Sequence, residues 1–163
     1  MKVAITGHTL GLGRACYIHY GINAVGFSRG NGYDINNPAD IIKDSADCDV
    51  FINNAYDGFA QVNLLYELIK TFKGKIINIS SNSSTGVKNK VWPYSIHKAA
   101  LDKASEQLSH NGYNVSNIRF GYIDTTRIKH IKEPKLSIQE AVLTIDDVIN
   151  SKNHIPLTTV LPT

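Results

Sequence analysis

The chain has 163 residues, of which 42% are hydrophobic and 19% are charged, as in an ordinary globular protein. This length suits one well-buried core and is too short for two ordinary domains, so we expect a single domain over residues 1–163. The formal net charge is +3, and the lysines are scattered rather than massed into a run that would follow a phosphate backbone. The sequence therefore argues against a nucleic-acid partner.

The N-terminus and the cysteines predict the compartment. Gly7 interrupts the first apolar stretch early, and no later stretch is long and apolar enough to span a membrane, so we expect no signal peptide and no membrane partner. Cys16 and Cys48 are the only cysteines and lack the spacing of metal ligands. We expect packing roles for both, no metal site, and a reduced cytoplasmic location.

Strand and helix patterns alternate along the chain. Short apolar runs predict strands at residues 3–6, 23–28, 49–53, 75–80, 114–120 and 155–161, with at most a minimal strand within 29–34. Helical spacing and stop signals predict helices at residues 12–20, 38–46, 57–72 and 93–111, and one after the capping-box pattern of Ser137 and Glu140. A loop is expected at 82–91. This order predicts a Rossmann-like doubly wound three-layer α/β/α sandwich with a mainly parallel six- to seven-stranded sheet.

A glycine-rich turn joins the first predicted strand to the first predicted helix. Gly7, Gly11 and Gly13 stand where backbone N–H groups can meet a pyrophosphate at the positive end of a helix. A glycine triplet alone is weak evidence, because a tight turn without a ligand has the same pattern. Its position between a strand and a helix favours a nucleotide site.

Ser81, Tyr94 and Lys98 form a second group. Tyr94 and Lys98 are four residues apart on a predicted helix, so their Cβ atoms lie roughly 5–6 Å apart on one face. The lysine ammonium favours the tyrosinate. Ser81 follows the strand at 75–80, at the carboxyl end where open α/β sheets bind ligands. Each pattern alone is more often an exposed helical pair or a turn, but together they predict a redox site beside the nucleotide.

Taken in order, these motifs resemble the classical short-chain dehydrogenase/reductase family. The matching elements are Thr6-Gly7-x-x-x-Gly11-x-Gly13, Asn54-Ala55, Ser81, Tyr94-x-x-x-Lys98 and Gly121-x-x-x-Thr125. The resemblance spans the whole chain, and the distance of thirteen positions from Ser81 to Tyr94 matches the family's spacing. It implies an enzyme that transfers hydride between nicotinamide and a small carbonyl or secondary alcohol.

The resemblance also implies individual roles. Tyr94 is the general acid/base, Ser81 binds the carbonyl oxygen, Lys98 also holds the nicotinamide ribose, and Asn63 holds a water of the proton relay. The implied cofactor-binding residues, besides Tyr94 and Lys98, are Gly7, Thr9, Leu10, Gly11, Leu12 and Gly13 in the turn, Asp34 and Ile35 at the adenine, Asn54, Ala55, and Thr125 at the carboxamide.

Three features depart from the family pattern. Tyr56 replaces the usual glycine after Asn54-Ala55, and Phe120 replaces the usual proline before Gly121. The chain is also much shorter than a typical member. The missing segments bear on substrate recognition, so the substrate is not predicted.

The end of the second predicted strand bears on cofactor choice. An acid there would accept both ribose hydroxyls and repel a 2′-phosphate, whereas this chain offers Ser28 and Arg29. We therefore expect NADP(H) to be favoured over NAD(H). The alternative is that Arg29 is a solvated turn residue. Solvent-exposed positions are likewise expected for Asp57 and for His97, which points around its helix from Tyr94 and Lys98.

Two other functions are compatible with the motifs. A nucleotide-binding regulator or scaffold would keep the pocket without useful turnover, although such a protein needs neither the serine nor the phenol. A nucleotide-sugar dehydratase or epimerase of the extended branch is opposed by the short chain and by the glycine spacing.

Apolar positions on two predicted helices bear on assembly. They would leave a large apolar patch on a monomer if one face alone were core. These positions are Leu64, Leu65, Leu68, Ala99, Leu101, Ala104 and Leu108. Together with the family resemblance they predict a homodimer or homotetramer.

Overall fold

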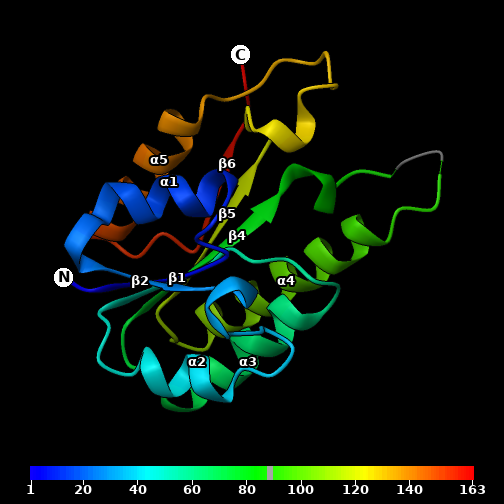
Figure 1. Cartoon of the computed structure of the whole chain (residues 1–163). Helices are drawn as coiled ribbons and strands as arrows, with labels where there is room; N and C mark the ends of the chain where they lie inside the picture. The colour runs from blue at the N-terminus through cyan, green and yellow to red at the C-terminus, as the bar shows by residue number, and fades with distance from the viewer. Residues whose placement is uncertain (88–89) are drawn as a thin grey trace.

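The computed structural model, which describes residues 1–87 and 90–163, contains one parallel β-sheet with helices on both faces (Figure 1). Its strands are β1 (Val3–Thr6), β2 (Ala24–Phe27), β3 (Val50–Asn53), β4 (Lys75–Ser81), β5 (Val115–Phe120) and β6 (Leu157–Val160). They lie in the order β2-β1-β3-β4-β5-β6, and every pair is parallel. The Rossmann-like fold expected from the alternating pattern is confirmed.

The helices form the two outer layers. They are α1 (Gly11–Tyr20), α2 (Ala39–Asp44), α3 (Ala60–Thr71), α4 (Pro93–His110) and α5 (Ile138–Asn150). Helices α1 and α5 cover one face, whereas α2, α3 and α4 cover the other (Figure 1). Alternate residues of each strand point to opposite faces, so Val3 and Ile5 pack under α1 and α5 while Ala4 packs against the other layer.

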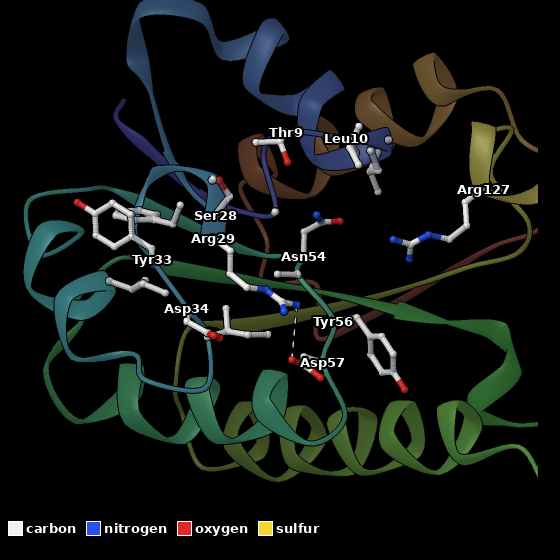
Figure 2. A pocket seen from close by; sticks show the side chains of 18 of the residues that line it. Thr9, Leu10, Ser28, Arg29, Tyr33, Asp34, Asn54, Tyr56, Asp57 and Arg127 are labelled. Atoms are coloured by element: carbon white, nitrogen blue, oxygen red, sulfur yellow. Dashed lines mark ion pairs between the residues drawn. The ribbon is translucent and has the colours of Figure 1, made fainter.

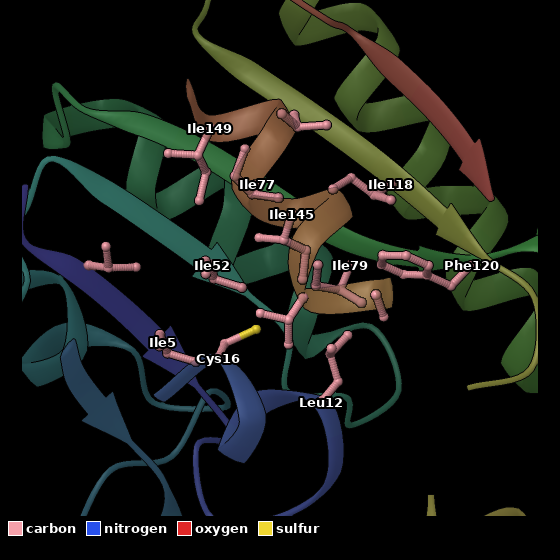
Figure 3. Close-up of a cluster of buried hydrophobic side chains, with 14 of the residues drawn as sticks. Ile5, Leu12, Cys16, Ile52, Ile77, Ile79, Ile118, Phe120, Ile145 and Ile149 are labelled. Carbon is pink, nitrogen blue, oxygen red and sulfur yellow. The ribbon is translucent and has the colours of Figure 1, made fainter. Parts of the chain in front are cut away.

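Each face of the sheet has its own apolar core. Figure 3 shows the α1/α5 side, where Ile5, Ile52 and Ile118 of the strands meet Cys16 of α1 and Ile145 of α5. Burial raises the pKa of the Cys16 thiol to about 12, which keeps it neutral and suits the packing role expected for it. Packing in the two cores holds the carboxyl ends of the strands next to the N-termini of the helices that follow them. The candidate site lies where these strands end and these helices begin.

Residues 29–34 do not form the minimal strand that was considered there. Arg29–Asn31 is instead a short 3-10 helix, η2, whose capping box is made by Ser28 and Asn31. Gly32 follows with φ +92, a left-handed conformation that ends the turn. This conformation breaks any extended run, so the sheet has six strands among the described residues. Residues 88–89 of the expected loop, including Lys88, lie outside the described residues.

Six of the seven apolar positions that suggested a dimer belong to the hydrophobic core of the chain, and Ala99 is partly buried. Leu64, Leu65, Leu68 and Leu101 are fully buried, and Ala104 and Leu108 nearly so, all under the sheet. Because the chain already covers these side chains, they leave no patch and do not support self-association. The homodimer or homotetramer therefore stays a prediction, now without support from these positions. Within the described residues, no helix is both long and apolar enough to cross a membrane.

Candidate active site

The glycine turn packs β1 tightly against α1. A Cβ atom on Gly13 would lie 2.2 Å from the Gly7 carbonyl oxygen, so only glycine fits there. Gly7 and Gly11 have φ +72 and +53, which favour glycine as well. No side chain caps the start of α1, and its first turn carries no acidic residue. The N–H groups of this turn are therefore free to bind an anion.

Thr6 and Asn54 join the turn to the end of β3. The Thr6 hydroxyl accepts hydrogen bonds from the backbone N–H groups of Asn54, at 2.9 Å, and Ala55, at 3.0 Å. The side-chain amide of Asn54 donates a hydrogen bond to the Thr6 carbonyl oxygen at 3.0 Å. These bonds hold two neighbouring strand ends in register beside the glycine turn. Asn54 and Ala55 thus lie where the sequence predicted them.

A cavity of about 500 Å³ opens above these strand ends (Figure 2). Twelve predicted cofactor-binding residues line it: Gly7, Thr9, Leu10, Gly11, Leu12, Ser28, Arg29, Asp34, Ile35, Asn54, Ala55 and Thr125. Tyr33, Tyr56, Asp57 and Arg127 line it as well and were not expected there. The volume is typical of a small-molecule site. The uncapped N–H groups at the start of α1, next to Gly7 and Gly11 in the cavity wall, fit a dinucleotide pyrophosphate.

One end of the cavity, defined here as the adenosine end, lies beyond β2. Ser28 donates a hydrogen bond to Asn31, and the side chain of Arg29 reaches across the cavity to Asp57 at 3.6 Å, as the dashed line in Figure 2 shows. Asp57 also accepts a hydrogen bond from Asn36. It is therefore the partner of Arg29 across the site, where the sequence suggested only a solvent-exposed helical position.

Ser81, Tyr94 and Lys98 are brought together at the other end of the site, defined here as the reacting end. Ser81 ends β4 and caps the short helix η3 (Asn82–Ser84), accepting a hydrogen bond from the Ser83 N–H. Tyr94 stands in the first turn of α4, where Pro93 fixes the helix start. The Ser81 hydroxyl is close enough to the Tyr94 phenol to lower its pKa. The predicted group is thus adjacent to the cavity, although its three side chains do not line the cavity wall.

The Lys98 ammonium is buried beneath this group. The side chain is 2% exposed and donates to Gln61 Oε1 at 2.8 Å and to the Ile79 carbonyl oxygen at 2.7 Å. Burial lowers its pKa to about 7, against a smaller opposite effect from the Asp102 carboxylate. Its Nζ lies 5.6 Å from the centre of the Tyr94 ring. Lys98 thus changes charge near neutral pH, close to the phenol.

The Tyr94 phenol stays protonated at neutral pH. Burial raises its pKa above the ordinary value, and the nearby Ser81 hydroxyl partly opposes this shift. Tyr56 raises the pKa further, and Arg127 lowers it. A protonated phenol suits the donation of a proton to a substrate oxygen.

Gln61 provides the side-chain acceptor for the Lys98 ammonium, and the sequence did not point to this residue. It lies in the first turn of α3, and its Nε2 donates to the carbonyl oxygens of Asn53, at 2.6 Å, and Ile79, at 3.1 Å. Asn63, predicted for the relay, is exposed on the outer side of α3 facing α2. The structure does not bring Asn63 to the site, because two residues along a helix rotate a side chain by more than half a turn.

Asp102 supports the site from behind. It follows Lys98 by one turn of α4 and is 8% exposed. Its carboxylate accepts hydrogen bonds from Ser80, from Asn117 at 2.7 Å and from Arg119 at 2.7 Å. These donors keep a negative charge fixed near Lys98. No sequence motif marks this group, which joins α4, β4 and β5.

Tyr56 and His97 form an aromatic wall beside Tyr94. The Tyr56 ring contacts the Tyr94 ring edge-on, with ring centroids 4.8 Å apart. The Tyr56 hydroxyl is hydrogen-bonded to His97 Nδ1 at 2.8 Å. Phe59 also packs against His97, with ring centroids 4.4 Å apart. His97 is therefore half-buried and bonded, not the surface residue expected. Figure 2 shows the Tyr56 ring directed away from the centre of the cavity.

The sheet order and the strand-end site define an α/β fold of the nucleotide-binding, Rossmann-like class. No protein-family model matches the chain, and no curated protein matches it in sequence. Solved structures do match it in shape. A 4-hydroxyisoleucine dehydrogenase mutant complexed with NADH and succinate has a TM-score of 0.82 at 18% identity, covering 99% of this chain and 97% of that one.

Two further structures agree. A short chain dehydrogenase from Burkholderia cenocepacia in complex with NADP has a TM-score of 0.76 at 20% identity, covering 100% of this chain and 90% of that one. Serine dehydrogenase from Escherichia coli has a TM-score of 0.74 at 16% identity, covering 99% of this chain and 96% of that one. The chain therefore has the fold of the short-chain dehydrogenases/reductases, as its motifs suggested.

Proposed function

We propose that this protein is a short-chain dehydrogenase/reductase that uses NADP(H) to interconvert a small carbonyl compound and its alcohol. The observation that carries the proposal is the meeting of Ser81, Tyr94 and Lys98 beside a cavity built on the glycine turn. Neighbours of the same fold hold NADH or NADP, which supports a nicotinamide cofactor. Cofactor-binding and catalytic residues would then share one domain over residues 1–163.

The chemistry assigns one role to each residue. Bound in the cavity, the nicotinamide supplies or accepts the hydride. Tyr94 donates a proton to the carbonyl oxygen during reduction, and Ser81 donates a hydrogen bond to the same oxygen as negative charge develops there. The Lys98 ammonium stabilises the tyrosinate that remains. Gln61 and the Ile79 carbonyl oxygen hold that ammonium in place.

The NADP(H) preference is a part of this proposal. Arg29 is the cation nearest the adenosine end, and Ser28 adds a hydroxyl beside it. A guanidinium binds a 2′-phosphate through charge-assisted hydrogen bonds. The partner that Arg29 now has, Asp57, is 46% exposed and forms a screened contact that a phosphate can replace.

One observation favours the alternative of a nucleotide-binding regulator. Tyr56 stands where the resembled family has glycine, and its ring lies 5.5 Å from the Lys98 Nζ. A side chain at this position fills space beside Lys98 that a glycine would leave open. A regulator would bind NADPH without consuming it.

A carbonyl screen separates the two functions. NADPH binding is measured first by fluorescence, and NADPH consumption at 340 nm is then followed with aldehydes, ketones and oxo acids. Turnover with any of these compounds that disappears in Tyr94→Phe supports the oxidoreductase. Tight NADPH binding without turnover across the panel supports the regulator, and the absence of NADPH binding contradicts both.

A further inference from the structure

Arg127 is a cation of the cavity wall whose charge is not matched by a carboxylate. Arg29 and Arg119 form ion pairs with Asp57 and Asp102, whereas Arg127 forms none with any carboxylate in residues 1–87 and 90–163. Its side chain is exposed and, in Figure 2, its guanidinium points into the cavity. A cation in a concave site, without a partner of its own, is arranged to bind an anionic ligand.

Arg127 lies at the reacting end of the cavity. It follows Thr125, whose methyl group would lie 3.5 Å from a Cβ on Gly11, and it belongs to the short helix η4 (Thr126–Ile128) after β5. It is close enough to Tyr94 to lower the pKa of the phenol. In Figure 2 it lies on the same side as Tyr56, away from Tyr33 at the adenosine end.

The segment around Arg127 concentrates positive charge at this end. Residues 126–135 contain four lysine or arginine residues and one glutamate, so their formal charge of +3 equals that of the whole chain. The segment is fixed at its base, where Ile123 pairs with Leu136 and the Asp124 N–H donates to the Leu136 carbonyl oxygen at 2.8 Å. A fixed basic segment beside a cleft raises the local concentration of anions.

The pyrophosphate of a dinucleotide does not account for Arg127. That group has its own donors in the uncapped first turn of α1, beside the glycine turn. The 2′-phosphate would lie at the opposite end, near Arg29. The anion left for Arg127 therefore belongs to the molecule that meets Tyr94.

We propose that the substrate is an oxo acid or hydroxy acid, and that Arg127 binds its carboxylate while Ser81 and Tyr94 meet its carbonyl oxygen. This inference rests on the proposed oxidoreductase function. In the reduction, the hydride from NADPH forms the new C–H bond, the carbonyl π electrons move to oxygen, and Tyr94 gives that oxygen its proton. Solvent then returns a proton to Tyr94, leaving NADP⁺ and the hydroxy acid.

Arg127 would also reduce the charge repulsion that such a substrate meets near Tyr94. A carboxylate beside Tyr94 opposes both the tyrosinate and the developing negative charge on the substrate oxygen. A guanidinium that pairs with the carboxylate removes most of this repulsion. Binding and turnover of an acid should therefore both depend strongly on Arg127, whereas a neutral ketone should depend on it much less.

The test compares matched carbonyl compounds. NADPH consumption is measured with 4-oxopentanoate and 5-oxohexanoate against 2-pentanone and 2-hexanone, in the unmutated protein, in Arg127→Gln and in the control Lys132→Gln. The control removes the same charge from the same segment at an exposed position outside the cavity wall. We expect the unmutated protein to prefer the acids, and Arg127→Gln to lower kcat/KM for them by about tenfold or more, as for a lost charge-assisted hydrogen bond.

The same variant should lower kcat/KM for the neutral ketones much less than for the acids, because it changes only the field at Tyr94, and it should leave the NADPH Kd within about twofold. Lys132→Gln should change kcat/KM little for either class. Equal use of acids and neutral ketones by the unmutated protein would overturn the inference while leaving the oxidoreductase intact. Weaker NADPH binding in Arg127→Gln, with both substrate classes equally affected, would reassign Arg127 to the cofactor. If no carbonyl compound is reduced, calorimetry with glutarate on the NADPH-bound protein decides: binding that Arg127→Gln removes supports the anion site, and no binding overturns it.

Discussion

The two ends of the cavity hold charge in different ways. At the adenosine end, Arg29 and Asp57 are paired at 3.6 Å with side chains that are 73% and 46% exposed. At the reacting end, Lys98 is 2% exposed and has two hydrogen-bond acceptors within 2.8 Å. Water screens the first pair and is excluded from the second group. In the proposed function, recognition of the nucleotide would thus use adjustable surface charges, whereas the chemistry would use charges fixed in the interior.

This difference ranks the expected effects of substitution. A change at the reacting end removes an interaction with few substitutes, because no water replaces the lost partner. A change at the adenosine end is partly compensated by solvent. Substitutions should therefore alter turnover strongly at one end and affinity moderately at the other.

The largest effect should come from Tyr94→Phe. Loss of the proton donor is expected to lower kcat by about a thousandfold, within the range of general acid catalysis, while the NADPH Kd changes little. Steady-state kinetics and a fluorescence titration measure the two quantities. Tyr66→Phe, which removes an exposed phenol from α3, is the matched control. Unchanged turnover in Tyr94→Phe would remove Tyr94 as the acid.

Lys98→Met should lower kcat nearly as much as Tyr94→Phe, but unlike that variant it should also weaken cofactor binding. We expect a fall in kcat and also weaker NADPH binding, because the ammonium both stabilises the tyrosinate and anchors the ribose in the proposed complex. The same two measurements show the contrast with Tyr94→Phe. A variant that loses turnover with an unchanged NADPH Kd would contradict the ribose contact.

The pH dependence should come from Lys98. Its ammonium loses a proton as the pH rises through a pKa of about 7, whereas Tyr94, with its raised pKa, stays protonated. The kcat/KM for carbonyl reduction should therefore fall above about pH 7, since it reports groups of the free enzyme. Asp102→Asn removes a charge that raises the pKa of Lys98, so the fall should begin at lower pH. An unmoved profile in Asp102→Asn would show that another group controls the rate.

The smallest effects should appear at the adenosine end. Arg29→Ala is expected to weaken NADPH by about tenfold and NADH by much less, as for a screened charge-assisted hydrogen bond. Asp57→Asn releases Arg29 from its ion pair and should tighten NADPH by a few-fold, in line with an exposed salt bridge. Titration of both cofactors against all three proteins tests this. Equal affinities of the unmutated protein for NADPH and NADH would contradict the proposed preference.

Local patterns predicted the parts of this molecule that depend on local physics. The glycine turn follows from backbone conformation and close packing at Gly7 and Gly13, and the Tyr94 and Lys98 pair follows from helix geometry, so both are visible in the sequence. Ser137 and Glu140 form the expected capping box at the start of α5. Six strands in the predicted order gave the correct fold.

Contacts across the fold were not visible in the sequence. Gln61 reaches Lys98 over 37 positions, and Asp57 reaches Arg29 from another strand end, without any periodicity to mark them. Asn63 was predicted to lie in the site by resemblance to the family. The side of α3 that faces the sheet is, however, set by the side chains that fill the core under β3 and β4. The burial of the apolar residues of α3 and α4 was not predicted for the same reason, since sequence alone does not say how much of a helix its neighbours cover.

The strand order has a consequence for how the chain folds during synthesis. Once β1, β2 and β3 have paired, every later strand joins the sheet at one growing edge, in the order in which the ribosome delivers it. No strand needs to be inserted between two that are already paired. A parallel sheet built from distant contacts folds slowly when it starts from a complete chain. Here the N-terminal strands can instead provide a template for the rest, and Ser81, Tyr94 and Lys98 are added to a glycine turn that is already in place.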